Sequence, residues 1–215
     1  MKTKLWKINE QNLNNTNLAL YSDFISKNYN INFGRDFDKI WRWSVENSKD
    51  FWKSIWDFTK IKGSQGKIHL KQSNIFFKNK FFPDGKINYA ENILKKNNND
   101  PAIIFKSENG YKTSLNWKSL NSDVSKVSNW MQTMSIKKGD RIAAYLPNIP
   151  EAVITYISTA ATGAIWSSCS PDFGYDSVFD RFNQIQPKFL FYHSEYTYNG
   201  KNFSLNSKVK KLKSS

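Results

Sequence analysis

The chain of 215 residues has a formal net charge of +14, one Cys and two His, and 16% of its residues are aromatic. The aromatic content excludes a disordered chain, the single Cys excludes an internal disulfide, and so few Cys and His side chains argue against a zinc site. No run approaches the roughly 20 apolar residues of a membrane helix, and residues 1–21 lack the apolar core of a signal peptide. We therefore expect a soluble, cytoplasmic protein without a transmembrane segment.

The first part of the chain has the pattern of a helical extension. Residues 1–20 are polar and rich in Asn, so we expect a loose arm. Residues 21–29 and 36–46 have the spacing of amphipathic helices, and Ser48 is placed to cap a third helix. One face of this third helix is crowded with aromatic and aliphatic side chains, which is more typical of a packed face than of a ligand-binding surface: Phe51, Trp52, Ile55, Trp56 and Phe58.

A turn and a short helix follow. Residues 83–85 read Pro-Asp-Gly, which predicts a turn because Pro fixes φ and Gly permits a positive φ. Residues 87–94 then predict a short helix with Tyr89 and Ile93 facing inward.

Residues 95–100 are polar and form the predicted boundary between a mostly helical region, 21–97, and a second region, 98–215. The second region opens with a predicted hairpin, whose strands lie on either side of a Glu-Asn-Gly turn at 108–110. A helix over 117–134 comes next, with apolar residues at helical spacing: Leu120, Val124, Val127 and Met131.

The pattern then alternates between strand and helix. The predicted order is a strand over 141–146, a helix from Pro150 to Gly163, a strand over 164–168, a helix that Pro187 ends, and a strand over 189–193. Short connections of this kind predict a parallel sheet with right-handed crossovers, so the fold class is α/β with a βαβαβ unit. Ligands bind beyond the carboxyl ends of such strands, which here are followed by loops at 147–148, 167–174 and 194–201.

Common catalytic and metal-binding motifs are absent from the sequence. It contains no G-x-G-x-x-G, G-x-x-x-x-G-K-[ST], C-x-x-C, H-E-x-x-H or G-x-S-x-G. His69 and His193 are isolated, and Cys169 is interpreted as a small buried residue. Capping and solvation account for the acidic residues at 172, 176 and 180. We therefore predict no catalytic residue and no metal ligand in this chain.

Several segments nevertheless resemble one family. Residues 82–94 read F-P-D-G-K-I-N-Y-A-E-N-I-L, which is similar to the W-F-P-x-x-x-L-N-Y-A-E-N-L signature of the acetyl-CoA synthetase N-terminal region, with Phe82 at the usual Trp. Residues 138–141 and 145–148, K-G-D-R and Y-L-P-N, resemble AMP-forming acyl-CoA ligases. Residues 167–174, S-S-C-S-P-D-F-G, resemble the acetoacetyl-CoA synthetase branch of that family.

The resemblance implies a two-step reaction. Acetoacetate attacks the α-phosphorus of ATP to give an acyl-adenylate and pyrophosphate, and the thiol of coenzyme A then displaces AMP. The implied cofactors of the full-length enzyme are ATP, Mg²⁺ and CoA, and its implied partners are the small-molecule substrates acetoacetate, ATP and CoA. The second region, 98–215, would be the incomplete start of an AMP-binding, adenylate-forming domain.

The family's Ser/Thr/Gly-rich phosphate loop and its C-terminal lysine domain do not occur in this sequence. The resemblance thus implies a truncated N-terminal fragment that is inactive alone and binds none of these cofactors strongly. The missing remainder of the ligase could be a separate chain and a partner. A non-catalytic CoA-binding or partner-binding module of the same fold is the alternative function.

One binding site is implied by the resemblance. In the acetyl branch, two arginines in an R-x-x-R pattern after the third strand contact the phosphates of CoA. The matching positions are Tyr198 and Lys201, so Lys201 keeps a cation and Tyr198 departs from the pattern. The loop that contains Asp172 would lie beside them. The alternative is that Lys201 is only a solvated lysine.

The net charge leaves a further alternative open. A strongly basic chain favours nucleic acid or an anionic membrane surface as a partner. The lysines are scattered, however, apart from a mild cluster in the tail, and no nucleic-acid recognition motif accompanies them. A basic nucleic-acid-binding protein is therefore kept only as the second alternative, and nucleic acid is not the expected partner.

Overall fold

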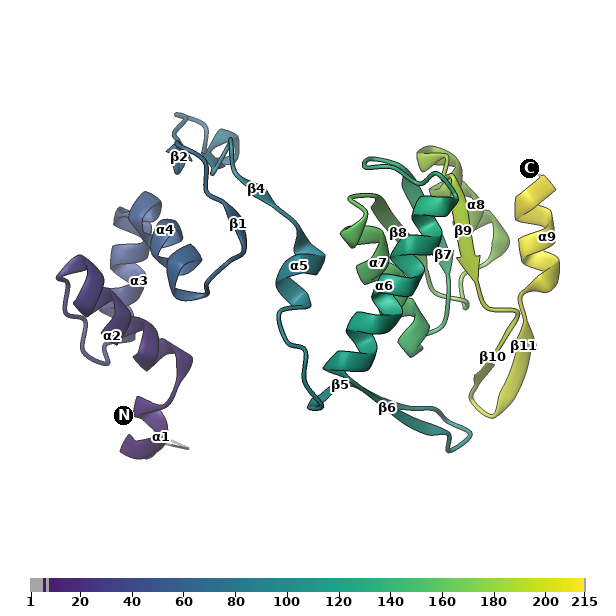
Figure 1. Ribbon diagram of the computed structural model, residues 1–215, viewed down its shortest axis with the longest axis horizontal. Coiled ribbons are helices and arrows are strands. Elements are labelled where there is room, and N and C mark those ends of the chain that lie inside the picture. The colour runs from purple at the N-terminus through teal and green to yellow at the C-terminus, as the bar shows by residue number, and fades with distance from the viewer. Residues whose placement is uncertain (1–5, 7, 215) are drawn as a thin grey trace, which may run out of the picture. The chain divides into compact units, whose positions relative to one another are not determined.

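The computed structural model describes residue 6 and residues 8–214. The chain divides into two compact units between Ile87 and Asn88, upstream of the boundary predicted after residue 97. Figure 1 shows the elements of both units, which are described separately below. Within the described part of the chain, every helix is too short or too polar to cross a bilayer.

The described residues of the first unit contain four α-helices: α1 (Glu10–Asn14), α2 (Asn17–Tyr29), α3 (Phe37–Glu46) and α4 (Ser48–Phe58). The segment 1–20 differs from the loose arm that was predicted, because the side chains of Asn9 and Thr16 accept hydrogen bonds from the backbone N–H groups of Asn12 and Ala19 and so cap α1 and α2. Residues 1–5 and 7 of that segment lie outside the described residues.

An aromatic core joins these helices. Its buried members come from α2, α3 and the loop between them: Tyr21, Ile25, Phe33, Ile40 and Trp43. Helix α4 packs the partly buried Phe51, Ile55 and Phe58 against them, from the face that the sequence pattern predicts to be packed. The prediction that Ser48 caps α4 was wrong, because Asn47 occupies the capping position and Ser48 is the first helical residue.

Short strands complete the first unit. Strand β1 (Gly63–Ser64) pairs with β4 (Lys86–Ile87), and β2 (Leu70–Lys71) pairs with β3 (Lys80–Phe81), both antiparallel. A 3₁₀ turn, η1 (Phe76–Lys78), lies between β2 and β3. The ring centroids of Trp52 and Phe81 are 5.8 Å apart, and those of Trp56 and Phe82 are 5.0 Å apart. Both tryptophans belong to α4, so these contacts fix the short strands to that helix.

The second unit begins with α5 (Tyr89–Ile93), the hairpin of β5 (Pro101–Lys106) and β6 (Lys112–Asn116), and α6 (Trp117–Thr133). The predicted hairpin and long helix are confirmed. The inward placement of Tyr89 was wrong: its side chain is 52% exposed and Ala90 is buried instead. Positions three and four after Ala90 are Ile93 and Leu94, which lie on the same helix face and pack with it.

The βαβαβ unit has the predicted order: β7 (Arg141–Tyr145), α7 (Pro150–Ala161), β8 (Ile165–Cys169), α8 (Tyr175–Ile185) and β9 (Phe189–Tyr192). The strands form one parallel sheet in the order β8-β7-β9. Ala143 lies opposite Ser167 on one side and Leu190 on the other. The α/β fold class is thereby confirmed.

The region after β9 differs from the prediction. Residues 194–201 were expected to be a loop, but β10 (Glu195–Tyr198) and β11 (Lys201–Ser204) form an antiparallel hairpin. A helix, α9 (Asn206–Ser214), follows it. The Asn-Gly pair at 199–200 explains the hairpin, since both residues have positive φ as a tight two-residue turn requires.

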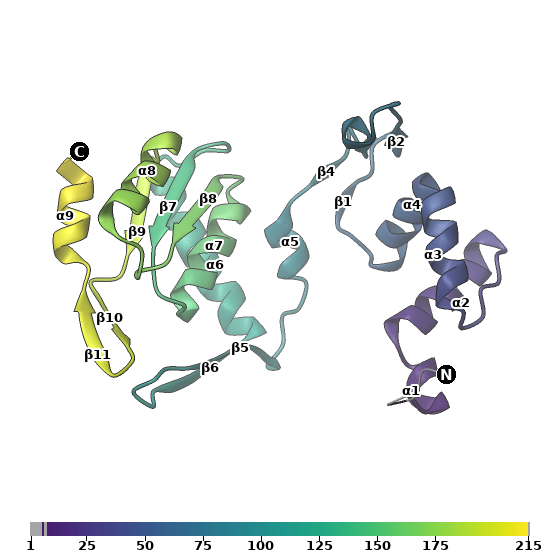
Figure 2. The same cartoon turned by 180° about the vertical axis from the view of Figure 1, so that it is seen from behind.

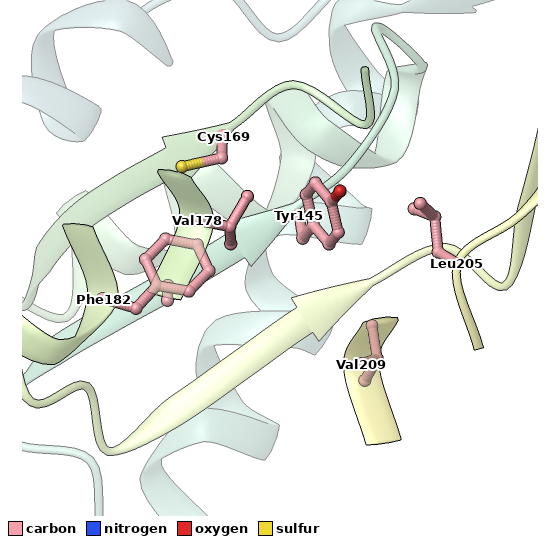
Figure 3. Close-up of a cluster of buried hydrophobic side chains, with 7 residues drawn as sticks. Tyr145, Cys169, Val178, Phe182, Leu205 and Val209 are labelled. Carbon is pink, nitrogen blue, oxygen red and sulfur yellow. The ribbon is translucent and has the colours of Figure 1, made fainter. Parts of the chain in front are cut away.

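Helices cover both faces of the sheet. Figures 1 and 2 show α6 and α7 on one face and α8 and α9 on the other. Ile142 faces the first side, where it packs with Met131 and Ile136. Ala143 and Tyr145 face the second side, where they pack with side chains from β8, α8, α9 and the residue before α9. Figure 3 shows this cluster at close range: Cys169, Val178, Phe182, Leu205 and Val209.

Candidate functional site

The carboxyl ends of the three parallel strands define the edge at which a site is expected. Tyr145 ends β7, Cys169 ends β8 and Tyr192 ends β9. Because the strands are parallel and in register, these residues and the loops after them lie at one edge of the sheet. The hairpin β10–β11 and helix α9 follow β9 directly.

Tyr145 links three of these segments. Its side chain is fully buried, and its Oη lies 2.7 Å from the carbonyl oxygen of Phe173, to which it donates, and 3.1 Å from that of Pro171. The Lys208 Nζ lies 3.3 Å from the same Phe173 oxygen and 3.5 Å from Tyr145 Oη. Three segments therefore meet at the Tyr145 phenol: the end of β7, the loop after β8 and helix α9.

The same phenol is a poor acid. Burial, together with smaller contributions from the nearby Tyr196, Cys169 and Asp172, raises the pKa of Tyr145 to about 12. The phenol remains protonated at neutral pH, so it acts as a hydrogen-bond donor to the loop. Tyr145 therefore positions the loop after β8.

Cys169 and His193 also lie at this edge. Burial raises the pKa of the Cys169 thiol, and Arg181 only partly opposes that shift, so the thiol stays neutral. This agrees with its interpretation as a small buried residue. His193 Nδ1 contacts the backbone oxygen of Glu195 at the start of β10. His69 belongs to the first unit, where its ring contacts Phe82.

Carboxylates are spread along the loop after β8 and the helix that follows. Asp176 lies in the first turn of α8, where it favours the positive end of the helix dipole. Asp172 precedes that helix in an exposed turn. Among residues 6 and 8–214, no three His, Cys, Asp or Glu side chains are grouped so that they could hold a metal ion.

The structure brings two of the three predicted CoA residues together. Tyr198 and Lys201 are directly opposite in the β10–β11 ribbon, and both are exposed. Asp172 is nearer the base of the hairpin: burial raises the pKa of Tyr196, and the Asp172 carboxylate adds a smaller contribution in the same direction. Tyr196 and Tyr198 are two positions apart on one strand, so they share a face of the ribbon.

Sequence reasoning missed a carboxylate at the tip of the hairpin. The backbone N–H of Gly200 donates to Glu108 Oε2 at 3.2 Å, which joins the β10–β11 turn to the β5–β6 turn. The two residues are 92 positions apart, and nothing in the local sequence indicates their contact. An anionic ligand at Lys201 would meet the negative charge of Glu108.

Helix α9 was also missed, although its sequence carried a signal. Leu205, Val209 and Leu212 have helical spacing and all contact the core. The lysines of this helix have aromatic partners: the Lys211 Nζ lies 3.8 Å from the centre of the Tyr175 ring and the Lys213 Nζ lies 5.2 Å from that of Tyr192. The basic tail is therefore fixed against α8 and β9.

Comparison with known proteins identifies the family. Residues 90–215, more than half of the chain, match the family model described as AMP-binding enzyme. The chain belongs to this AMP-binding enzyme family. Its relatives include the acetoacetyl-coenzyme A synthetase of Rhizobium meliloti (strain 1021), which is 36% identical over 206 residues, or 96% of this chain. The acetoacetyl-CoA synthetase of Macaca fascicularis is 37% identical over 82% of this chain.

A solved structure has the same arrangement of elements. The structure of the acetoacetyl-CoA synthetase from Streptomyces lividans superposes on 99% of the present chain with a TM-score of 0.90, and the two sequences are 28% identical. The resemblance to acetoacetyl-CoA synthetases that the sequence motifs indicated is thereby confirmed. The chain spans about a third of the length of these proteins: 32% of the Rhizobium protein, 27% of the Macaca protein and 33% of the Streptomyces chain.

Proposed function

We propose that this chain is part of an ATP-dependent ligase that joins acetoacetate to coenzyme A. The single observation that carries the proposal is the 36% identity to an acetoacetyl-coenzyme A synthetase over 96% of this chain. Membership in the AMP-binding family implies ATP, Mg²⁺ and CoA for the whole enzyme. The AMP-binding part would begin within residues 88–98, and a cytoplasmic location remains the expectation.

The proposed reaction has two steps. A carboxylate oxygen of acetoacetate forms a bond to the α-phosphorus of ATP, and pyrophosphate leaves. The thiol sulfur of CoA then attacks the acyl carbon, AMP leaves with the bridging oxygen, and the thiol proton is released. Fixed donors and cations that stabilise phosphate charge are what such chemistry needs from a protein.

Within this chain, we propose that the β10–β11 hairpin contributes to CoA binding. Tyr198 and Lys201 lie opposite one another and are exposed, so a phosphate can reach the ammonium group from solvent. The loop with Asp172 is held in place by Tyr145 and would border the same site. Glu108 is the opposing charge that a phosphate would have to displace from the Gly200 N–H.

We also propose that the 215-residue chain forms no acyl-adenylate by itself. The reason is that the phosphate loop and lysine domain implied by the family resemblance do not occur in its sequence. Acetoacetate-dependent release of AMP by this chain alone would contradict the proposal. Binding of CoA by a complete gene product that forms no AMP would favour the non-catalytic module instead.

The substrate assignment is tested with the complete gene product purified from its own cells. AMP release is followed with ATP, Mg²⁺ and CoA, and the acid is varied between acetoacetate and acetate. We expect acetoacetate to give the larger kcat/KM. A larger kcat/KM with acetate would contradict the assignment to acetoacetate while leaving the ligase chemistry in place.

A further inference from the structure

The first unit exposes an apolar surface, here called the tip, and none of the residues proposed for CoA binding belongs to it. It lies on the hairpin formed by β2, η1 and β3, residues 70–81. Phe76 is 89% exposed and Phe77 is 81% exposed in η1. Ile75 beside them and Ile68 before β2 are also more than 40% exposed. Contiguous apolar side chains at the surface are typical of an interaction site.

This tip is held by its own hydrogen bonds. The backbone N–H of Ser73 donates to Asn79 Oδ1 at 2.7 Å, and the N–H of Ile75 donates to Ser73 Oγ at 3.2 Å. At the base, the N–H of Phe82 donates to the carbonyl oxygen of His69 at 3.0 Å. The two exposed phenylalanines are therefore presented on an ordered hairpin that is fixed to α4 through the Trp52–Phe81 contact.

The hairpin itself is basic. Residues 70–81 contain three Lys and neither Asp nor Glu. The carboxylate of Asp84 lies at its base, where it accepts hydrogen bonds from the backbone N–H groups of Lys67 and Ile68. Lys71 and Lys80 lie directly opposite each other in the β2–β3 ribbon. Like charges at opposed positions destabilise a ribbon, and an anion between them would remove that cost. Leu70 and Phe81, the neighbouring opposed pair, share the other face of the ribbon, where Phe81 contacts Trp52.

We propose that the β2–β3 hairpin binds the surface of an anionic phospholipid bilayer. Phe76 and Phe77 would enter the boundary between headgroups and acyl chains, and Lys71, Lys78 and Lys80 would bind the lipid phosphates. Apolar insertion and attraction to anionic lipids are the two terms that set such binding. The proposal uses residues of the first unit only, so it stands or fails independently of the ligase function.

The shape of the hairpin favours lipid over nucleic acid. Proteins that bind single-stranded nucleic acid use a positive groove in which bases stack on aromatic rings. Here the rings lie at the projecting turn of a hairpin, and the aliphatic Ile68 and Ile75 beside them offer no surface for base stacking. Aliphatic side chains next to exposed rings are suited to hydrocarbon.

The experiment is cosedimentation of the 215-residue chain with vesicles of phosphatidylcholine, with and without phosphatidylserine, at low and high salt. We expect binding only to the vesicles with phosphatidylserine, and release by salt. The double variants Phe76→Ser/Phe77→Ser and Lys71→Gln/Lys80→Gln should each weaken binding by at least about tenfold. The lysine variant should melt no earlier than the parent, because it removes a repulsion.

A matched control is available in the second unit. Lys106 and Lys112 are also directly opposed in the β5–β6 hairpin, so Lys106→Gln/Lys112→Gln removes the same charge from a similar ribbon. This variant should keep most of the binding. An equal loss in the control, or no binding to the anionic vesicles at low salt, would overturn the proposal. Capture of single-stranded DNA that Phe76→Ser/Phe77→Ser abolishes would overturn it in favour of nucleic acid.

Discussion

The hydroxyl group of Tyr145 donates to the carbonyl oxygen of Phe173 at 2.7 Å, across 28 positions of sequence. This bond fixes the loop after β8 to the end of β7, and Lys208 of α9 donates to the same oxygen. Asp172, which lies between Pro171 and Phe173, is placed by this arrangement. The bond is therefore the first target for substitution.

Tyr145→Phe removes this hydroxyl and little volume. We expect the free energy of unfolding to fall by about 1 kcal/mol, because a buried hydrogen bond is lost while Lys208 still satisfies the Phe173 oxygen. Urea denaturation measures the change. The control is Tyr198→Phe, whose phenol is 63% exposed and should leave the midpoint unchanged. Equal effects of the two variants would mean that Tyr145 contributes no specific bond.

Alkaline pH should weaken the fold through the same residue. The unfolded phenol ionises near its ordinary pKa of 10.0, whereas burial raises the pKa of folded Tyr145 to about 12. The unfolded state therefore releases its proton first, and stability falls as pH rises between these two values. As pH rises over this range, the urea midpoint of Tyr145→Phe should fall less steeply than that of the parent chain. A residual slope is expected because burial also raises the pKa of Tyr21. Identical slopes would contradict the assignment.

Gly63 should not tolerate a side chain. Its φ is +147°, and a Cβ built there would lie 2.4 Å from the carbonyl oxygen of Lys86 on the paired strand. Gly63→Ala should therefore separate β1 from β4 and destabilise the first unit by several kcal/mol, roughly the combined cost of strain and a lost strand pair. Urea denaturation measures this as well.

Gly110 provides the comparison. Its φ is also positive, at +85°, but a Cβ there would meet nothing within 4 Å. Gly110→Ala should cost only about 1 kcal/mol from backbone strain. If Gly63→Ala were no more harmful than Gly110→Ala, the close approach of β1 and β4 would be refuted.

The proposed CoA site predicts opposite effects of Lys201 and Glu108 on CoA binding. Lys201→Gln should raise the Kd for CoA by about two- to fivefold, as expected for an exposed charge pair. Glu108→Gln should lower the Kd by a similar factor, because it removes the carboxylate that accepts from Gly200. Isothermal titration of the complete gene product gives both values.

Two controls make this test specific. Pantetheine lacks the phosphates of CoA, so its Kd should not change with either substitution. Lys210→Gln removes an exposed lysine of α9 and should leave CoA binding unaffected. An unchanged Kd for CoA in Lys201→Gln would remove this lysine from the proposed site.

The sequence predicted the elements whose apolar period is regular. Strands β7, β8 and β9 and the helices between them are marked by apolar runs and by Pro150 and Pro187, and their parallel pairing follows from short connections. Helix α9 was missed because its lysines concealed the spacing of Leu205, Val209 and Leu212. The motif resemblance indicated Tyr198 and Lys201.

Contacts across long sequence separations could not be predicted in the same way. The Gly200–Glu108 bond depends on how two separate hairpins approach each other, and the bonds at Tyr145 depend on the path of a loop. Neither leaves a period or a spacing in the sequence. The opposed charges of Lys71 and Lys80 likewise became visible only with the strand register.

The most direct test of the proposed ligase function follows one oxygen atom. The complete gene product is incubated with ATP, Mg²⁺, CoA and acetoacetate whose carboxylate carries oxygen-18, and the AMP is analysed by mass spectrometry. Attack of the carboxylate on the α-phosphorus predicts transfer of a labelled oxygen to AMP, together with acetoacetyl-CoA as the product. Unlabelled AMP, or ADP and labelled phosphate in its place, would contradict an acyl-adenylate and with it the function proposed for this chain.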